Sequence, residues 1–245
     1  MPTSASLFLT SVDVATSSSD LAWAAAAEGA ATGTAFLVGE QTAGRGRRGT
    51  AWSSGRGGMY LSVLLRPAIP ATRFFGLSFI AALAIRAELA TRLPEQTITL
   101  KWPNDILAGG GKVCGILLEA RGDAVVIGTG VNIAPVAPVA GARLPAVSVH
   151  ELGATDVTAR ELADNYGQAL LARVEAYARV GFAPVRLEWL RHCAHIGQQM
   201  RISTGADVIE GVFTDLDSDG ALVLDDGSGV RTRVTTGDVE LMGTP

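Results

Sequence analysis

Residues 97–133, TITLKWPNDILAGGGKVCGILLEARGDAVVIGTGVNI, contain three apolar runs that predict β-strands. The first run covers 97–102 and is stopped by Pro103, which cannot continue a paired strand. The second and third runs, at 113–119 and 124–133, predict a hairpin because only the tight turn at 121–123 separates them. The segment therefore predicts antiparallel strands within a β-sheet.

The chain on either side of this segment predicts helices and two more buried strands. Short apolar runs bounded by glycine predict the strands at 35–38 and 60–65. Helices are predicted at 17–31, 74–93, 158–180 and 184–195, with a serine cluster before the first, Pro94 after the second and a Thr158/Glu161 capping box on the third. A proline-rich loop at 134–145 separates the hairpin from the last two helices.

The C-terminal part of the chain has a different pattern. From Gln198 onward, short runs of alternating apolar and polar residues are separated by turns at 217–220 and 226–229. Four or five such strands in this length predict a small closed barrel. The sequence therefore predicts a boundary near Gly197, with one domain at 1–196 and a second at 197–245.

The composition limits the class of protein. The chain has 245 residues, 48% hydrophobic and 18% charged, with a net charge of -4, so it is globular and does not coat nucleic acid by bulk charge. No basic residue precedes Arg45, as a secretory signal would require, and the longest apolar stretch, at 74–85, is too short to cross a bilayer. The two cysteines, Cys114 and Cys193, lie in apolar contexts and predict reduced thiols. We therefore expect a cytoplasmic protein that does not enter membranes.

The charged residues are distributed unevenly. Residues 41–87 contain no Asp or Glu, but they contain seven arginines and many glycines, most of these within 44–58. Glycine lets the backbone approach a ligand closely, and arginine attracts anions, so this segment predicts a phosphate or carboxylate ligand. The only lysines, Lys101 and Lys112, lie in one short stretch. Their position favours a site that requires a compact ammonium group.

Several familiar motifs fail on closer inspection. Residues 44–49, GRGRRG, match a dinucleotide fingerprint, but the sequence after them is too rich in glycine to open a helix. Residues 109–112, GGGK, lack the first glycine and the final hydroxyl of a phosphate loop. The group His192, Cys193 and His195 lacks a fourth ligand at suitable spacing, so no metal site is predicted. No nucleophilic serine or cysteine motif is evident either.

Four stretches in order along the chain resemble the biotin protein ligase family. They are QTAGRGRRG at 41–49, KWPND at 101–105, GKVCGILLE at 111–119 and GTGVN at 128–132. The resemblance covers nearly the whole chain. It implies an α+β fold, with a mixed or antiparallel central sheet and helices like those of class II synthetases, and a small C-terminal SH3-like barrel.

The family activity that this resemblance implies has two steps. Biotin and ATP, with Mg²⁺, give biotinyl-5'-adenylate and pyrophosphate, and the biotinyl group then passes to a lysine of a biotin carboxyl carrier domain. Because a carboxylate must attack a polyanion, cations have to offset the repulsion between them, and preorganised donors lower such a barrier most. The mechanism needs no side-chain nucleophile, in agreement with the sequence.

The resemblance also implies roles for individual residues. Arg45, Arg47 and Lys112 would supply the catalytic cations, and Asp105 would hydrogen-bond the incoming lysine amine. The residues implied to bind biotin are Ser17, Ser18, Gln41, Gly44, Arg45, Arg47, Lys112 and Gly115. Those implied to contact the nucleotide are Trp52, Asn104, Lys112 and Asn132.

The sequence departs from the family pattern in two places, and it leaves two other functions open. Ser17-Ser18-Ser19 stands where Ser-Thr-Asn is usual, and Thr50 stands where many relatives have arginine. A lipoate ligase or octanoyltransferase would share the fold and also acylate a lysine. An RNA-binding module could use the arginine and glycine loop, although few aromatic residues lie beside it. The ligand motifs begin near Ser17, so no operator-binding module and no DNA binding are expected, whereas homodimer formation is left open.

Overall fold

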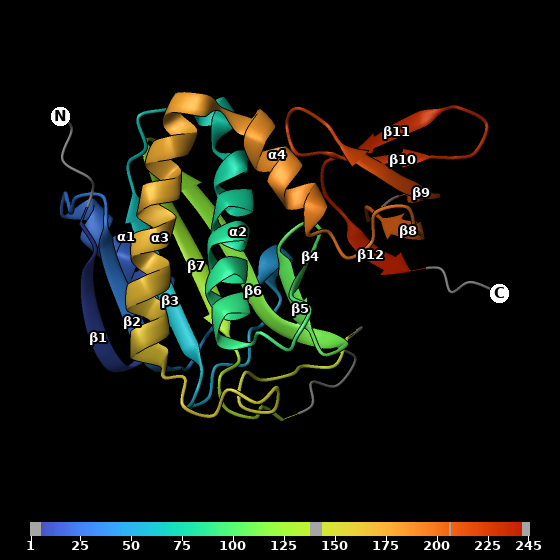
Figure 1. Cartoon of the computed structure of the whole chain (residues 1–245). Helices are drawn as coiled ribbons and strands as arrows, with labels where there is room; N and C mark the ends of the chain where they lie inside the picture. The colour runs from blue at the N-terminus through green and yellow to red at the C-terminus, as the bar shows by residue number, and fades with distance from the viewer. Residues whose placement is uncertain (1–5, 138–143, 206, 242–245) are drawn as a thin grey trace.

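The computed structural model describes residues 6–137, 144–205 and 207–241, so part of the predicted loop at 134–145 lies outside the described residues. A seven-stranded sheet forms the larger part of the molecule, with the strand order β1-β2-β3-β7-β6-β5-β4 (Figure 1). Its strands are β1 (Phe8–Ala15), β2 (Thr34–Gln41), β3 (Met59–Leu65), β4 (Thr99–Lys101), β5 (Asp105–Ala108), β6 (Gly111–Arg121) and β7 (Ala124–Val131). The β1 and β2 strands are parallel and every other neighbouring pair is antiparallel, so the sheet is mixed.

Helices cover the two faces of this sheet unequally. The long helices α2 (Phe75–Arg92) and α3 (Ala159–Val180) lie side by side over one face (Figure 1). On the other face, α1 (Ser18–Ala27) packs mainly on β2, β3 and β7 and reaches Glu119 and Arg121 of β6 through Trp23, so its contacts are concentrated over one half of the sheet. The remaining helical segments are α4 (Phe182–Arg191) and the short turns η1 (Arg47–Gly49) and η2 (Ala71–Arg73).

Strand β3 shows why both faces need apolar side chains. All seven of its residues are buried, and alternate side chains point to opposite faces of the sheet. Leu61, Val63 and Leu65 join the main core beneath α2 and α3, whereas Leu64 joins a small cluster with Trp23 of α1. Ser62 is also fully buried on the α1 face, so one polar side chain interrupts this apolar run.

The second sheet is formed by the C-terminal residues. It is antiparallel, with the order β11-β10-β9-β8-β12, and its strands are β8 (Gln199–Ser203), β9 (Val208–Leu216), β10 (Leu222–Asp225), β11 (Arg231–Val234) and β12 (Asp238–Leu241). The turn after β9 packs against the part of the molecule formed by the larger sheet. There, Trp102 Nε1 donates to the Gly220 carbonyl at 3.2 Å. A Cβ atom on Gly220 would lie 2.7 Å from the Phe79 ring, so only glycine allows this approach.

The predicted fold class is confirmed, with corrections to individual elements. The mixed central sheet with helices and the separate C-terminal antiparallel sheet both form. The sequence missed β1, an edge strand whose residues are half-buried or exposed, and the short β5. Helix α1 ends at Ala27 and α4 ends at Arg191, both earlier than predicted. Residues 192–194 instead run along β4, where Leu100 N donates to the His192 carbonyl and Ala194 N donates to the Leu100 carbonyl.

Candidate functional site

One row of residues crosses five strands on the face that α1 leaves partly uncovered. Each of these residues is paired directly with the next: Tyr60 with Gly130, Gly130 with Gly115, Gly115 with Asp105, and Asp105 with Lys101. Directly paired residues of neighbouring strands project on the same face. The two glycines therefore make a flat floor, with a phenol at one side and charged groups at the other.

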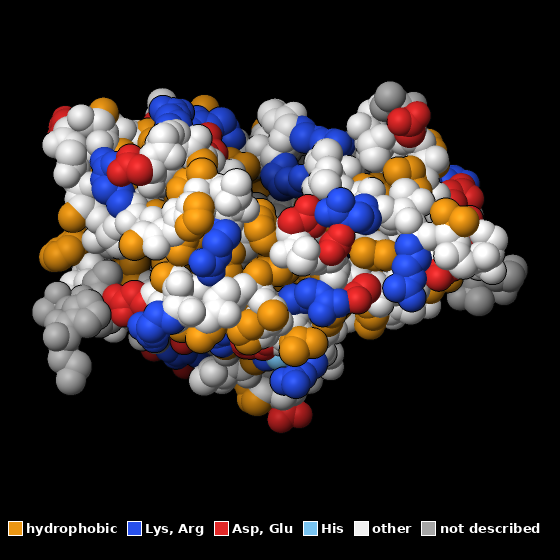
Figure 2. All heavy atoms as spheres, turned by 90° about the horizontal axis from the view of Figure 1, so that it is seen from above, with side chains coloured by type: hydrophobic (Ala, Val, Ile, Leu, Met, Phe, Trp, Pro, Cys, Tyr) orange, Lys and Arg blue, Asp and Glu red, His pale blue; other side chains and the backbone are white. Residues whose placement is uncertain are grey.

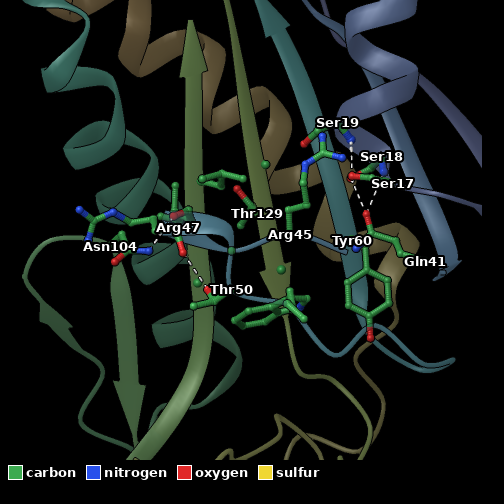
Figure 3. A pocket seen from close by; sticks show the side chains of 18 of the residues that line it. Ser17, Ser18, Ser19, Gln41, Arg45, Arg47, Thr50, Tyr60, Asn104 and Thr129 are labelled. Atoms are coloured by element: carbon green, nitrogen blue, oxygen red, sulfur yellow. Dashed lines mark hydrogen bonds between the residues drawn. The ribbon is translucent and has the colours of Figure 1, made fainter. Parts of the chain in front are cut away.

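A cavity of about 310 Å³ lies above this floor (Figure 3). It contains all the predicted catalytic residues, Arg45, Arg47, Asp105 and Lys112. Its lining also includes these predicted binding residues: Ser17, Ser18, Gln41, Trp52, Asn104 and Gly115. Segments from both ends of the larger sheet thus meet at one place, and the guanidinium-bearing loop and the Lys112 strand lie on the same side of the molecule.

Trp52 explains why the floor contains glycine. A Cβ atom on Gly130 would lie 2.6 Å from Trp52 Nε1, and one on Gly115 would lie 2.8 Å from Trp52 Cζ3. The indole therefore lies directly on the backbone of β6 and β7. The Lys112 ammonium is 5.1 Å from the centre of the Trp52 ring, within the range of a cation–π contact. Trp52 and Lys112 also line a second cavity, of about 160 Å³.

The end of the cavity near α1 is lined by hydroxyl and amide groups. Ser17 caps α1, and its hydroxyl accepts a hydrogen bond from Ser19 N at 3.2 Å. Gln41, at the end of β2, accepts from Ser18 N at 2.8 Å and from Ser18 Oγ at 3.1 Å through its Oε1 atom. Figure 3 shows these side chains gathered at one end of the cavity. This group is polar and carries no formal charge.

Two residues of this end were missed by the sequence analysis. Ser62 Oγ lies 2.8 Å from Ser18 Oγ and 3.1 Å from Ser19 Oγ, although Ser62 belongs to the neighbouring strand β3. Tyr60 lines the cavity and donates from its hydroxyl to the Gly55 carbonyl at 2.7 Å. Burial raises the pKa of Tyr60 to about 12, so the phenol is neutral at physiological pH. A serine inside an otherwise apolar strand was the available signal for Ser62.

The opposite end of the cavity is charged. Lys112 Nζ lies 2.6 Å from Asp105 Oδ1, and Lys101 Nζ lies 3.8 Å from Asp105 Oδ2. The Lys101 and Asp105 side chains are only 15% exposed, so the attraction is screened less than at an open surface. Asn104 fixes the turn before Asp105, because its Nδ2 donates to the Ile116 carbonyl at 2.8 Å and its own carbonyl accepts from Ile116 N at 3.0 Å.

The two predicted catalytic arginines reach in different directions. Arg45 pairs with Asp20 of α1 at 2.7 Å, and this hydrogen-bonded cation lowers the pKa of the Asp20 carboxyl below its ordinary value. Arg47 Nη2 donates instead to Thr236 Oγ1, at 3.3 Å, in the segment between β11 and β12. Figure 3 shows the two guanidinium groups at opposite sides of the cavity. The C-terminal sheet therefore contacts the arginine loop directly.

Two predicted binding residues lie outside this lining. Gly44 allows a close backbone approach, since a Cβ atom there would lie 2.3 Å from Ser54 Oγ. Asn132 is buried and its Nδ2 donates to the carbonyls of Lys112 and Val147, each at 3.2 Å. It therefore ties β6 to residue 147, and it lines the second, smaller cavity together with Trp52 and Lys112.

Within the described ranges, the structure gathers no group of three or more His, Cys, Asp or Glu side chains suited to a metal ion.

His195 is buried, and the pKa of its imidazole is lowered first by burial and then by the nearby Lys101. Both cysteines also have a raised pKa because they are buried, to about 11 for Cys193. In the same described part of the chain, no helix has both the length and the apolar character needed to span a bilayer.

Known proteins resemble this chain in both sequence and structure. Residues 14–132 match the Biotin/lipoate A/B protein ligase family, and residues 195–242 match the Biotin protein ligase C terminal domain. The biotin--[acetyl-CoA-carboxylase] ligase of Paracoccus denitrificans is 40% identical over 201 residues, which are 77% of this chain and 82% of that protein. The ligase of the same name from Mycobacterium tuberculosis is 34% identical over 223 residues, 88% of this chain and 82% of that protein.

A solved structure matches the fold across both sheets. The biotin protein ligase from Aquifex aeolicus in complex with biotin and ATP superimposes with a TM-score of 0.83 and covers 96% of this chain and 99% of its own. Its sequence identity is 23%, so this match concerns the fold. The sequence relatives match over most of their own length, and they confirm the resemblance carried by the four motifs. This chain belongs to the biotin protein ligase family.

Proposed function

We propose that this protein activates biotin with ATP as biotinyl-5'-adenylate and transfers the biotinyl group to a lysine of a biotin carboxyl carrier domain. The observation that carries the proposal is the polarity of the cavity. Neutral hydroxyl and amide groups line one end, where the charge of Arg45 is already paired with Asp20, Lys112 and Arg47 lie toward the other end, and a flat glycine floor joins the two. Biotin has the same polarity, with a neutral ureido ring at one end and a carboxylate at the other.

The relatives support the chemistry as well as the fold. Two curated relatives are named biotin--[acetyl-CoA-carboxylase] ligase, and the Aquifex aeolicus structure holds biotin and ATP. A Leishmania major biotin protein ligase, 26% identical, was solved with biotinyl-5-AMP. We therefore assign this chain the same substrates, biotin and ATP, and the same intermediate.

In the first step, an oxygen of the biotin carboxylate forms a bond to the α-phosphorus of ATP, and the bond to pyrophosphate breaks. Both reactants are anions, so their approach requires nearby positive charge. We assign this role to Lys112, which lies over the floor beside Trp52, with Arg45 and Arg47 from the loop. The partners of these cations include the Asp105 and Asp20 carboxylates and the Thr236 hydroxyl, which anionic substrates would replace.

In the second step, the carrier lysine amine attacks the carbonyl carbon of the adenylate, and AMP leaves. Asp105 is proposed to hydrogen-bond this amine. Asp105 lines the cavity, its Oδ1 lies at 2.6 Å from Lys112 Nζ, and its side chain is 15% exposed. Trp52 is proposed to cover the adenylate, and Asn104 and Asn132 to contact or shape its nucleotide part.

Magnesium is proposed to enter with ATP. Among the described lining residues of the cavity, Asp105 is the only carboxylate, and it already pairs with two lysines. This set does not fit a magnesium ion held by the protein alone. Mg²⁺ commonly keeps several waters and binds substrate phosphates, so we place it on ATP and assign it no residue.

The remaining predictions concern the organisation and setting of the protein. We propose a catalytic domain at 1–196 and a C-terminal domain at 197–245, supported by the two separate sheets and by the family match that begins at residue 195. Cytoplasmic location and the absence of DNA binding stay predictions, and homodimer formation is left open as it was by the sequence. In the view of Figure 2 acidic and basic side chains are interspersed, which does not favour broad binding of nucleic acid on that face.

The direct test is incubation of the full chain with biotin, MgATP and a carrier domain. We expect a stable biotinylated lysine on the carrier and release of pyrophosphate that depends on biotin. Replacing biotin with lipoate or octanoate tests the related acyl ligases, and we expect little pyrophosphate release with either. Absence of labelling with biotin, in a folded preparation that binds ATP, would refute the proposed function.

A further inference from the structure

Ser62 is a buried polar residue for which neither the motifs nor the proposed mechanism gives a role. Its exposed fraction is 0%, and the neighbouring residues of β3 are all buried and mostly apolar. Its hydroxyl lies within hydrogen-bond distance of Ser18 and Ser19, two residues that line the cavity. The hydroxyl groups of these two residues are called the wall below. A buried hydroxyl is costly unless it is hydrogen-bonded, so the direction of these bonds matters.

The orientation of the Gln41 amide fixes the first of these directions. Ser54 Oγ donates to the Trp52 carbonyl at 2.9 Å, which can only accept, so Ser54 must accept from Gln41. The Gln41 nitrogen therefore faces Ser54, at 2.8 Å, and its Oε1 faces Ser18. The Ser18 backbone N–H, which can only donate, points at the same Oε1 from 2.8 Å and requires the same orientation.

The hydroxyl hydrogens then have one consistent arrangement. Gln41 Oε1 only accepts, so the Ser18 hydroxyl donates to it. Since the Ser18 hydrogen is used, the 2.8 Å contact requires Ser62 to donate to Ser18. The Ser62 hydrogen is then used as well, and the 3.1 Å contact requires Ser19 to donate to Ser62. Every hydrogen in the series points away from Ser19 and toward Gln41.

This arrangement decides what the wall offers to a ligand. A hydroxyl oxygen has two lone pairs. Ser18 uses one of them for Ser62, and Ser19 keeps both within the part of the chain that the structure describes. A Cβ atom on Gly128 would lie 3.2 Å from Ser19 Oγ, so the glycine keeps that side of the cluster open. The wall therefore presents hydrogen-bond acceptors, although serine could equally donate.

We infer that Ser62 is a positioning residue that fixes the Ser18 and Ser19 hydroxyls as acceptors for the N–H groups of the substrate ring. The inference rests on the proposed function, because the ureido ring of biotin has two N–H donors. A lipoyl or octanoyl group has none, so the same polarity selects against those acyl groups. Ser62 itself lies beneath the wall and acts on the ring through Ser18 and Ser19.

The experiment compares two ligands in two proteins. The ligands are biotin and an isosteric analogue in which oxygen replaces one ring N–H, and binding to the full chain is measured by calorimetry. The wild type should bind the analogue about tenfold more weakly, about 1.4 kcal/mol. In Ser62→Ala, the freed Ser19 hydroxyl can turn and donate to the ring oxygen, so the preference should fall to about twofold, near the worth of a weak hydrogen bond. A merely structural role would weaken both ligands equally and leave their ratio unchanged.

Two further variants control the comparison. Ser62→Cys keeps nearly the same volume but hydrogen-bonds weakly, so it should shift the ratio in the same direction if Ser62→Ala fails to fold. Ser78→Ala removes a half-buried hydroxyl of α2 that bonds only to the Phe75 carbonyl among the described residues, and the ratio should stay at the wild-type value. Thermal unfolding checks that each variant is folded.

An unchanged ratio in the folded Ser62 variants would overturn the inference, as would a wild type that binds both ligands equally. Either result leaves the proposed function standing if the wild type still biotinylates the carrier. Conversely, failure to biotinylate the carrier would refute the proposed function whatever the ratio. We expect the KM of Ser62→Ala for ATP to equal that of the wild type, because the hydroxyl groups of Ser18, Ser19 and Ser62 lie at the opposite end of the cavity from Lys112.

Discussion

The two ends of the cavity are built on different physical principles. At the serine end, Ser18 and Ser19 are no more than 5% exposed, and their hydroxyls belong to one continuous series of hydrogen bonds. At the charged end, Lys112 is held by an ion pair with Asp105, the two side chains being 28% and 15% exposed, and Arg47 comes from a loop that contains Arg48 in the left-handed region with φ 54°. One end is therefore fixed before any ligand binds, whereas the other is held by contacts that a ligand can exchange.

The difference follows from the groups involved. A buried hydroxyl must find a partner within the protein, so the neutral end is ordered by its own hydrogen bonds. An arginine on the surface can pair with any nearby acceptor at little net gain, and its present partner is replaceable by a substrate anion. We conclude that recognition of the ring is preorganised and that charge stabilisation depends on rearrangement of the loop.

The largest expected effect concerns the charged end. Lys112→Ala should reduce the rate of biotinyl-adenylate formation by about 10²–10³, because it removes one donor to the developing negative charge. Biotin affinity should fall much less, since the ring is held at the serine end. Pyrophosphate release at saturating biotin and calorimetric biotin binding measure the two quantities separately. An equal loss in both would mean that the ends of the cavity are not independent.

The second prediction tests the floor between the two ends. In Gly130→Ala the added Cβ would lie 2.6 Å from the Trp52 indole, so the ring must move away from the sheet. We expect the KM for ATP to rise about tenfold, equivalent to about 1.4 kcal/mol, with a smaller rise for biotin. Gly55→Ala is the matched control, because nothing lies within 4 Å of its added Cβ. Similar kinetics for the two variants would contradict the proposal that the Trp52 ring must lie directly on the backbone at Gly130.

The third prediction tests the contact between the arginine loop and the C-terminal sheet. Thr236→Val keeps the shape of the side chain and removes the hydroxyl that accepts from Arg47 at 3.3 Å. Since the pair is exposed, we expect a change of about twofold in the rate of adenylate formation, corresponding to a fraction of a kcal/mol. Single-turnover kinetics can resolve such a change. Thr235→Val is the control, and an equal effect there would remove the Thr236 contact from the explanation.

The smallest expected effect concerns the Arg45–Asp20 ion pair beside the serine end. Arg45 lowers the pKa of Asp20 below the ordinary 3.8, so the pair stabilises the fold above that value and the contribution is lost as the pH falls through the lowered pKa. Asp20→Asn should therefore lower the melting temperature slightly near neutral pH, with a cost of about 0–1 kcal/mol because the pair is exposed. Below the lowered pKa the difference from wild type should vanish. A difference that persists there would show that Asp20 acts other than through its charge.

The sequence predicted the charged end better than the neutral end. Lys112, Asp105 and Arg47 lie in conspicuous sequence motifs, and the structure gathers them in one cavity. Ser62 lies in a strand that the sequence placed correctly, but its partners are on α1, more than 40 residues away. No local pattern connects them. Thr236 was missed for the same reason, since its partner Arg47 is 189 residues distant.

The missed strands have a related explanation. β1 lies at the edge of the sheet, and its burial follows no strict alternation, so the usual strand signal is weak. β5 has four residues and directly follows the polar turn at Asn104, where the sequence suggested a site rather than a strand. Both strands exist because a neighbouring strand supplies their hydrogen bonds: β2 for β1 and β6 for β5.

The sequence by itself determined the composition of the site and most of the helices and strands, because glycine, proline, capping residues and apolar periodicity act over a few neighbouring residues. The tertiary structure alone decided which residues share the floor. Tyr60, Gly130, Gly115 and Asp105 form one row only because the register of four antiparallel strands aligns them, and a slip of one residue would turn each to the other face. The direction of the hydroxyl hydrogens was decided in the same way, since it requires Gln41, Ser18 and Ser62 to meet from three separate elements.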